Sequence, residues 1–204
     1  MAALHTPQSV LLYGAGGHAA VLADVLAAQG RTVAGLFADE PPARDWGATP
    51  YLGPYDPEAY PDLPLILAIG HNAARRDLAV QIRHRFAEGI HPSVLLSPTA
   101  GLGEGTVLYH GAIVQAGVQL GRHVIVNTGA TIDHDCRIGD FAHIAPGCNL
   151  CGGVEVGEGA LVGVGAKLIP GVRVGAWATV GAGAVVVQDV PAGQTVVGAP
   201  ARPR

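Results

Sequence analysis

The chain has 204 residues and a formal net charge of −4, and 49% of its residues are hydrophobic while 14% are charged. This apolar content excludes a disordered chain. The lack of a clustered basic segment argues against nucleic acid as a partner. Gly, His and Asp interrupt the longest apolar run, which argues against a membrane-spanning segment. The first residues lack a basic leader region, and three cysteines form no even disulfide framework. We therefore expect a cytoplasmic protein.

Short apolar runs and helical composition alternate at the start of the chain. Residues 9–13, SVLLY, predict a buried strand, and the glycine turn GAGGH follows it. Residues 19–30 have helical composition and end at Gly30, a natural C-terminal stop. Residues 32–39, TVAGLFAD, predict a second strand.

A long connection separates these elements from a third strand. Residues 40–64 contain seven prolines and predict irregular structure. Residues 65–70, LILAIG, predict the third strand, and residues 72–88 predict a helix. This alternation is typical of a small parallel sheet. Residues 1–88 are thus predicted to form an α/β half-Rossmann domain.

From residue 90 onward an aliphatic residue recurs at every sixth position. All seventeen residues in this series, from Ile90 to Val186, are Ile, Leu or Val. Small residues dominate four positions after each of them, as at Ala112, Cys136 and Cys148. A period of six is neither helical nor simple strand alternation, and it is the hexapeptide signature of a parallel β-helix.

Three hexads make one triangular coil of 18 residues, with the aliphatic side chains pointing inward. Residues 89–204 are therefore predicted to form a β-helix domain, with between five and six coils over residues 90–191. Cys136 and Cys148 fall on the small inward-facing phase. This register favours core packing over the metal or redox role that Cys148-x-x-Cys151 would otherwise suggest.

Polar residues are concentrated in residues 130–147, ATIDHDCRIGDFAHIAPG. The six-residue phase runs unbroken through them, so the polar side chains take outward positions. His134 should lie near a turn, and an imidazole there suits general-base catalysis because it titrates near neutrality. A neighbouring carboxylate, Asp133 or Asp135, could fix its tautomer. The alternative is a solvated histidine on a turn.

His143 follows His134 by nine residues, which is half a coil. The two side chains should therefore face different directions within one subunit. If both serve one reaction centre, they come from different subunits, as a threefold trimer would allow. The alternative for His143 is a buried or interface residue with structural hydrogen bonds. Asn127 either binds an acceptor sugar or occupies a left-handed turn.

The glycine turn near the N-terminus matches a dinucleotide-binding fingerprint. Gly14, Gly16 and Ala19 satisfy G-x-G-x-x-G/A, and Asp39 ends the second strand twenty residues after Ala19. Read alone, this pattern predicts an NAD-dependent dehydrogenase. Three strands supply only one mononucleotide half, however, and the β-helix offers a separate active-site architecture, so we expect no NAD. The turn amides could still bind a phosphate, with Asp39 or Glu40 at the ribose or base.

The repeat, the segment 133–147, the C-terminal VVGAPAR and the N-terminal YGAGGHA together resemble the bacterial nucleotide-amino-sugar N-acetyltransferases. These are left-handed β-helix acyltransferases, close relatives of the sialic acid O-acetyltransferases. The resemblance covers essentially the whole chain. It implies a left-handed β-helix, a homotrimer with intersubunit sites, acetyl-CoA as the donor, and a UDP- or GDP-linked amino sugar as the acceptor, with no metal.

The resemblance also assigns roles to individual residues. It makes His134 the catalytic base, Asp135 the acid that orients its ring, and His143 a contact of the thioester end of acetyl-CoA. Gly152 and Gly153 are candidates for the pantetheine arm, and the basic candidates for the CoA phosphates are Lys167, Arg173 and Arg202. The candidates for binding the nucleotide sugar are Gly14, Gly16, Gly17, His18, Asp39, Glu40, Asn72, Arg75 and Asn127.

Two further functions remain open at this point. O-acetylation of a sialic acid or related sugar would use the same constellation but would not obviously need a nucleotide pocket. A non-catalytic or metal-binding β-helix, as in γ-carbonic-anhydrase-like proteins, would need three converging histidines. The spacing of the available histidines does not match that pattern; they are His110, His123, His134 and His143.

Overall fold

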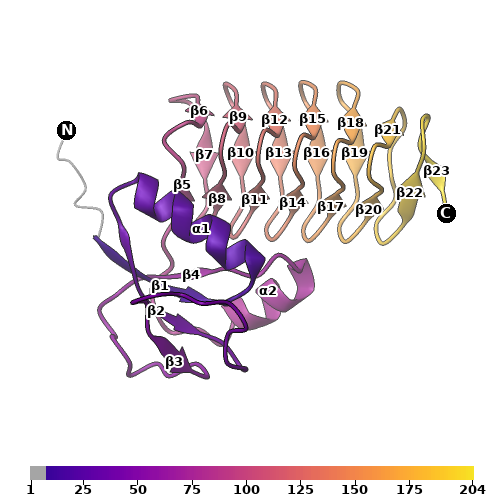
Figure 1. Ribbon diagram of the computed structural model, residues 1–204. Helices are drawn as coiled ribbons and strands as arrows, with labels where there is room; N and C mark the ends of the chain where they lie inside the picture. Colours follow the sequence, from indigo (N-terminus) through magenta and orange to yellow (C-terminus); the bar gives the residue numbers. More distant parts are fainter. Residues whose placement is uncertain (1–7) are drawn as a thin grey trace.

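The computed structural model describes residues 8–204 (Figure 1). The N-terminal domain is built on a parallel sheet of four strands in the order β3-β2-β1-β4. Its elements are β1 (Ser9–Tyr13), α1 (Gly17–Ala28), β2 (Thr32–Phe37), β3 (Tyr51–Gly53), β4 (Leu65–Leu67) and α2 (Asn72–Ala79). The three predicted strands and the helix that ends before Gly30 are present, and β3 is an addition within the proline-rich connection.

The second helix is shorter than the sequence predicts. It ends at Ala79, whereas the prediction extended it to residue 88. Tertiary pairing replaces the rest of the helix: the chain forms a parallel bridge between Phe86 and Leu65 at the edge of β4. The Phe86 ring also packs edge-on against His123, with centroids 4.4 Å apart. These contacts override the local helical pattern.

The rest of the chain forms a parallel β-helix with three sheets. Strands one coil apart pair in parallel, so that His143, for example, lies opposite Ile125. The six-stranded sheet contains β6 (Leu95–Leu96), β9 (Ile113–Val114), β12 (Thr131–Ile132), β15 (Asn149–Leu150), β18 (Lys167–Leu168) and β21 (Val185–Val186). The five-stranded sheet contains β7 (Gly101–Leu102), β10 (Gln119–Leu120), β13 (Arg137–Ile138), β16 (Glu155–Val156) and β19 (Arg173–Val174).

The third side of the β-helix is the eight-stranded sheet. It contains β5 (Gly89–Ile90), β8 (Val107–Leu108), β11 (Ile125–Val126), β14 (His143–Ile144), β17 (Leu161–Val162), β20 (Thr179–Val180), β22 (Thr195–Val197) and β23 (Arg202–Pro203). The last strand, β23, pairs with β22 in the antiparallel direction and ends the sheet. Within residues 8–204, no helix is long and apolar enough to cross a membrane.

The interior of the β-helix confirms the six-residue register. The aliphatic residues from Leu108 to Val186 in the predicted series are buried, and the first three members pack partly buried against the same core at the open end of the stack. Cys136 and Cys148 lie in this core with no exposed surface. The coils also approach closely at the glycine edges: a Cβ atom at Gly157 would lie 2.5 Å from the backbone nitrogen of Ala176.

The N-terminal domain packs against the outer surface of the eight-stranded sheet. Helix α1 lies between the four-stranded sheet and the β-helix (Figure 1), and its Leu22 and Val25 share one apolar core with Val107 and Ile125. The domain therefore covers the first coils of this side.

Arg75 in α2 completes this attachment. The side chain is 1% exposed; its Nε donates a 3.0 Å hydrogen bond to the carbonyl of His123, and its Nη2 donates one of 2.6 Å to the carbonyl of Phe141. His123 and Phe141 occupy corresponding corners of successive coils, both with positive φ. Burial lowers the pKa of Arg75 to about 10, so the guanidinium stays charged at neutral pH.

Candidate active site

His134 and Asp135 form a hydrogen-bonded pair at the turn between β12 and β13. The ring Nδ1 lies 2.9 Å from Oδ2 of Asp135, and the backbone N–H of His134 donates to Oδ1 of Asp133 at 2.8 Å. The bond to Asp135 raises the pKa of His134, and the charge of Asp133 raises it further. Because a carboxylate accepts from Nδ1, the proton sits there and Nε2 carries the free lone pair.

The His134 ring is open to an incoming molecule. Its side chain is 62% exposed and that of Asp135 is 74% exposed. Within residues 8–204, Nε2 of His134 makes no hydrogen bond. A basic nitrogen with a fixed tautomer and a free lone pair can accept a proton from a bound nucleophile.

His143 occupies the opposite kind of environment. It points outward from β14 under the N-terminal domain, where burial and then the charge of Arg75 lower its pKa to about 4. Its Nε2 lies 3.1 Å from Nδ2 of Asn127, and Oδ1 of Asn127 accepts from the N–H of Thr128 at 2.8 Å. The amide therefore donates to Nε2, and the backbone of Gly70 partly offsets the lowering of the pKa.

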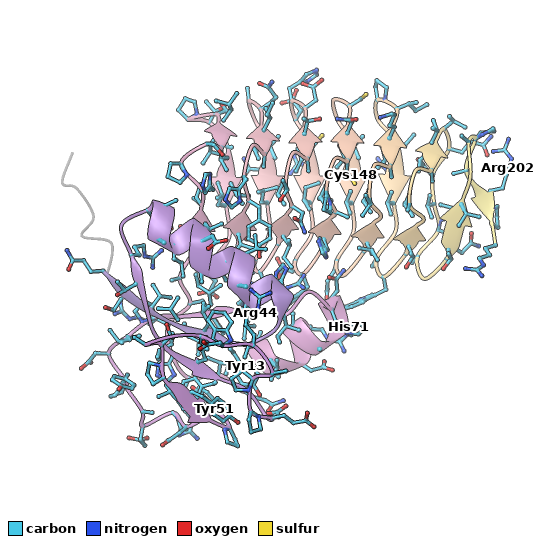
Figure 2. All side chains as sticks on the ribbon, in the orientation of Figure 1. Tyr13, Arg44, Tyr51, His71, Cys148 and Arg202 are labelled. Carbon is cyan, nitrogen blue, oxygen red and sulfur yellow. The ribbon has the colours of Figure 1, made fainter. Side chains whose placement is uncertain are left out.

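A cavity of about 600 Å³ extends from His143 between the two domains. The β-helix contributes Leu161, Thr179 and Trp177 to its walls, and the start of α2 contributes His71 and Asn72. His71 is labelled at this position in Figure 2. His134 does not line this cavity, so one chain places the two histidines on separate sides of the β-helix.

A second cavity, of about 520 Å³, brings together five of the predicted nucleotide-binding residues: Gly14, Gly16, Gly17, Asp39 and Glu40. A Cβ atom at Gly14 would lie 2.7 Å from the carbonyl oxygen of Ala68, whereas nothing lies within 4 Å of that position at Gly16 or Gly17. The backbone of these last two residues is thus accessible at the start of α1, where helix N–H groups favour an anion. Tyr13 and Arg44 also line this cavity (Figure 2).

One carboxylate of this cavity is oriented by a tyrosine. The Tyr13 hydroxyl donates a 2.7 Å hydrogen bond to Oδ1 of Asp39. Burial, followed by this bond, raises the pKa of Tyr13 to about 12, so the hydroxyl stays protonated. Asp39 keeps its second oxygen for a ligand donor.

Four predicted sugar-binding residues lie outside this second cavity. Arg75 is buried, and its guanidinium bonds the backbone of the β-helix. Asn72 donates to the carbonyls of Gly159 and Ala160 at 3.0 and 3.2 Å and lines the cavity beside His143. His18 is turned inward, with Nε2 2.8 Å from the Tyr109 hydroxyl. Asn127 lies beside His143.

The candidates for CoA binding fall on different sides of the β-helix. Gly152 lies directly beside the His134 ring, and Gly153 follows it in a left-handed turn with φ of 69°. Lys167 extends a ladder on the six-stranded sheet: its Nζ donates to Asn149 at 3.1 Å, and Asn149 donates to Thr131 at 2.9 Å.

Arg173 and Arg202 lie away from that ladder. Arg173 projects from the five-stranded sheet and forms an ion pair of 3.4 Å with Glu155. Arg202 lies on the last strand (Figure 2). Among residues 8–204, there is no group of three or more His, Cys, Asp or Glu side chains that could hold a metal ion.

Two residues at the domain boundary had no role in the predictions. Tyr109, which is buried, anchors His18, and Trp177 receives the Arg76 guanidinium over its ring at 4.6 Å. The available signal was positional: both are aromatic residues in a repeat whose outward and corner positions are mostly polar or glycine.

Comparison with known proteins identifies the N-terminal domain first. Residues 9–82 match the family model of the PglD N-terminal domain. UDP-N-acetylbacillosamine N-acetyltransferase from Bacillus subtilis (strain 168) is 40% identical over 112 residues, which are 50% of this chain and 51% of that protein. The chain thus spans about half the length of the curated relative that it matches.

Solved structures match nearly the whole chain. PerB from Caulobacter crescentus, in complex with CoA and GDP-perosamine, is 40% identical, with a TM-score of 0.90, over 96% of this chain and 97% of that chain. A variant of GDP-perosamine N-acetyltransferase from the same organism, with a histidine replaced by alanine, has a TM-score of 0.92, with 40% identity over 96% of both chains.

A third structure comes from a different organism. The acetyltransferase domain of PglB from Neisseria gonorrhoeae FA1090, in complex with acetyl coenzyme A, is 37% identical, with a TM-score of 0.87, over 98% of this chain and 100% of that chain. These matches confirm the resemblance drawn from the sequence motifs. Since the identity of 40% extends over 96% of both chains, the chain belongs to the nucleotide-amino-sugar N-acetyltransferases.

Proposed function

We propose that this chain transfers the acetyl group of acetyl-CoA to the amino group of a UDP- or GDP-linked amino sugar. The observation that carries the proposal is the His134–Asp135 pair, whose free Nε2 faces outward from a turn of the β-helix. Relatives that match over nearly the whole chain support it, because they are solved with CoA and GDP-perosamine or with acetyl coenzyme A. Acetyl-CoA as the donor agrees with the cytoplasmic location expected from the sequence.

The chemistry needs one proton acceptor and no covalent enzyme intermediate. The neutral sugar amine attacks the thioester carbonyl, and Nε2 of His134 takes the proton that the nitrogen loses. The carbon–sulfur bond then breaks, and His134 returns the proton to the CoA sulfur. Asp135 keeps the other proton on Nδ1 and stabilises the imidazolium that forms between these steps.

The two cavities suggest where the substrates bind. The nucleotide would occupy the N-terminal cavity, with its phosphates at Gly16 and Gly17 and with Asp39 or Glu40 near the ribose or base. The thioester end of acetyl-CoA would reach His143, and Gly152 and Gly153 would flank the pantetheine arm. Lys167 is the basic candidate on the six-stranded sheet.

We propose that the working enzyme is a homotrimer of left-handed β-helices. One chain holds His134 at a turn beside the six-stranded sheet and His143 on the eight-stranded sheet. Packing one of these sides against the other in a neighbouring subunit would join the two half-sites, and a threefold axis repeats that contact three times. The N-terminal domain would then bring the nucleotide to a shared cleft.

A substrate panel tests the proposed reaction. CoA release from acetyl-CoA would be measured with UDP-amino sugars, GDP-amino sugars and free amino sugars, and mass spectrometry would locate the acetyl group. We expect N-acetylation of a nucleotide-linked sugar and little turnover of the free sugar. Preferential acetylation of a hydroxyl group on a free sugar, or no turnover with any sugar, would contradict the proposal.

A further inference from the structure

The turn that carries His134 and Asp135 differs from the turns stacked above and below it. At the corner between the six-stranded and five-stranded sheets, Gly117, Asp135, Gly153 and Gly171 occupy corresponding positions in successive coils, and all four have positive φ. Asp135, with φ of 60°, is the member with a side chain. A residue with a Cβ atom is strained in this conformation, and such strain commonly persists at functional sites.

The carboxylate of Asp135 lies over the preceding coil. A Cβ atom added at Gly117 would lie 2.5 Å from Oδ1 of Asp135, a separation that packed atoms do not tolerate. Gly117 also has φ of +73°, a conformation that favours glycine, and a side chain there would displace the adjacent carboxylate. The space taken by Oδ1 thus exists because this position has no side chain.

The ring of His134 lies over the following coil in the same way. A Cβ atom added at Gly152 would lie 2.5 Å from both Cε1 and Nε2 of His134. The φ of Gly152 is not in the left-handed region, so its backbone conformation would accept alanine. A side chain there would instead meet the neighbouring imidazole.

We propose that Gly117 and Gly152 are positioning residues for the His134–Asp135 pair. Gly117, in the preceding coil, leaves room for the Asp135 carboxylate, and Gly152, in the following coil, leaves room for the His134 ring. The inference rests on the proposed function only in taking His134 as the base. It gives Gly152 a role that does not depend on its contact with CoA. It also gives a role to Gly117, one coil before the pair in the stack.

The two glycines should have different signatures. A methyl group at Gly117 pushes the carboxylate away from Nδ1 and weakens the bond that fixes the tautomer. A methyl group at Gly152 meets the ring itself and re-aims Nε2. Misplacing a catalytic group by about 1 Å costs roughly 10²-fold in rate, so we expect Gly152→Ala to lower kcat by about that factor.

The titration of His134 tests Gly117 without turnover. The intact protein, labelled with 13C-histidine, would be titrated by NMR as the parent chain, Gly117→Ala and Asp135→Asn. The bond to Asp135 raises the pKa of His134, so we expect both variants to lower it. Gly193→Ala is the matched control, because Gly193 has φ of +72° and open space at its Cβ position. An unchanged His134 pKa in Gly117→Ala would overturn the role of Gly117.

A double-mutant cycle in thermal unfolding tests Gly152. Gly152→Ala should lower the Tm of the parent chain but not that of His134→Ala, in which the ring is missing. An equal loss of Tm in both backgrounds would overturn the role of Gly152. If Gly117→Ala does not fold in the parent chain, Gly117→Ala is introduced into the Asp135→Gly variant instead, and the Tm is measured. A loss of Tm no larger than that caused by Gly193→Ala supports the role of Gly117, and a larger loss contradicts it.

These measurements distinguish the positioning role of Gly117 and Gly152 from the assignment of His134 as the base. Full activity of His134→Ala would end the assignment of His134 as the base, yet the titration and both cycles would still report on the two glycines. Conversely, if Gly152→Ala and His134→Ala show no coupling in Tm, the positioning role of Gly152 is overturned and the assignment of His134 as the base is unaffected.

Discussion

The turn that carries His134 and the strand that carries His143 place the same side chain in opposite surroundings. At the turn, Asp135 and Asp133 raise the pKa of an exposed ring. On the strand, burial under the N-terminal domain and the charge of Arg75 lower the pKa of His143 to about 4. The first ring is prepared to gain a proton, and the second stays neutral over the physiological range.

This contrast separates two tasks that an acetyl transfer requires. A base must be able to accept a proton near neutral pH, whereas a group that only binds or polarises a carbonyl must not compete for it. Groups whose surroundings drive their pKa values apart commonly divide the acid–base work in this way. The N-terminal domain, for which we propose a nucleotide-binding role, therefore also lowers the pKa of His143 through burial and through Arg75.

Removing His134, the exposed histidine of the two, should have the largest effect on activity. We expect His134→Ala to lower kcat by roughly 10²–10⁴-fold, because among residues 8–204 no other histidine has a free, carboxylate-oriented nitrogen at that turn. Steady-state kinetics would measure the loss. CoA affinity by calorimetry and the Tm serve as controls and should change little, since the side chain is 62% exposed. Near-normal turnover would contradict the assignment.

Removing the charge of Arg75, which lowers the pKa of the buried His143, should also lower the stability of the protein. Arg75→Met leaves the carbonyls of His123 and Phe141 without their buried donor, so we expect the free energy of unfolding to fall by about 2–4 kcal/mol. The pKa of His143 should rise, because Arg75 lowers it. Urea unfolding and histidine NMR would measure the two effects.

The adjacent arginine is the control for this experiment. Arg76 stacks on Trp177 and pairs with Asp77, and its side chain is 43% exposed. Arg76→Met should therefore lower the free energy of unfolding by less than about 1 kcal/mol. Equal losses for the two variants would argue against Arg75 as the link between the domains.

Mixing variant subunits tests whether the two histidines meet across an interface. If His134→Ala and His143→Ala each inactivate the enzyme, random trimers from an equal mixture should regain about one quarter of the parent activity. The fraction follows because a shared site is intact only when each neighbour supplies its unmutated histidine. Activity after unfolding and refolding the mixture would measure it. No recovery would point to sites within single chains.

The last expected effect concerns the dependence of stability on pH. The pKa values of His143, His18 and His123 are each lowered to about 4 in the folded protein, chiefly by burial, from an ordinary 6.5. Between these values the unfolded chain binds more protons, so the stability present above pH 6.5 is lost as the pH falls toward 4. Each histidine should contribute at most about 1.4 kcal/mol per pH unit.

Urea unfolding at several pH values would measure this slope. His134 acts in the opposite sense, because its pKa is raised, but solvent screens so exposed a group. A free energy of unfolding that is constant from pH 7 to pH 4 would show that the three rings are not held neutral.

The β-helix could be predicted from the sequence because each hexad repeats the same local rule. An inward aliphatic residue such as Ile132 or Ile138 sits at the same place in every coil, so the period alone sets the register, the inward Cys136 and the outward His134. A residue-by-residue rule of this kind needs no knowledge of distant contacts.

In the N-terminal domain, local sequence patterns do not predict the contacts that decide the structure. The second helix stops early because Phe86 pairs with Leu65 and packs on His123, and Arg75 bonds carbonyls 48 and 66 residues away. No local pattern encodes partners at such separations. The glycine turn was locally encoded, and Gly14 and Gly16 of the fingerprint line one cavity together with Asp39.

The reversed last strand has a consequence for how these molecules coexist at high concentration. A stack of parallel coils presents, at its open end, a row of backbone groups on which another chain could continue the stack. Here β23 runs antiparallel to β22 and exposes Arg202 and Pro203. A charged residue and one without a backbone N–H are poor templates for a further strand. The reversal thus makes this edge of the eight-stranded sheet a poor template for stacking one β-helix on the next.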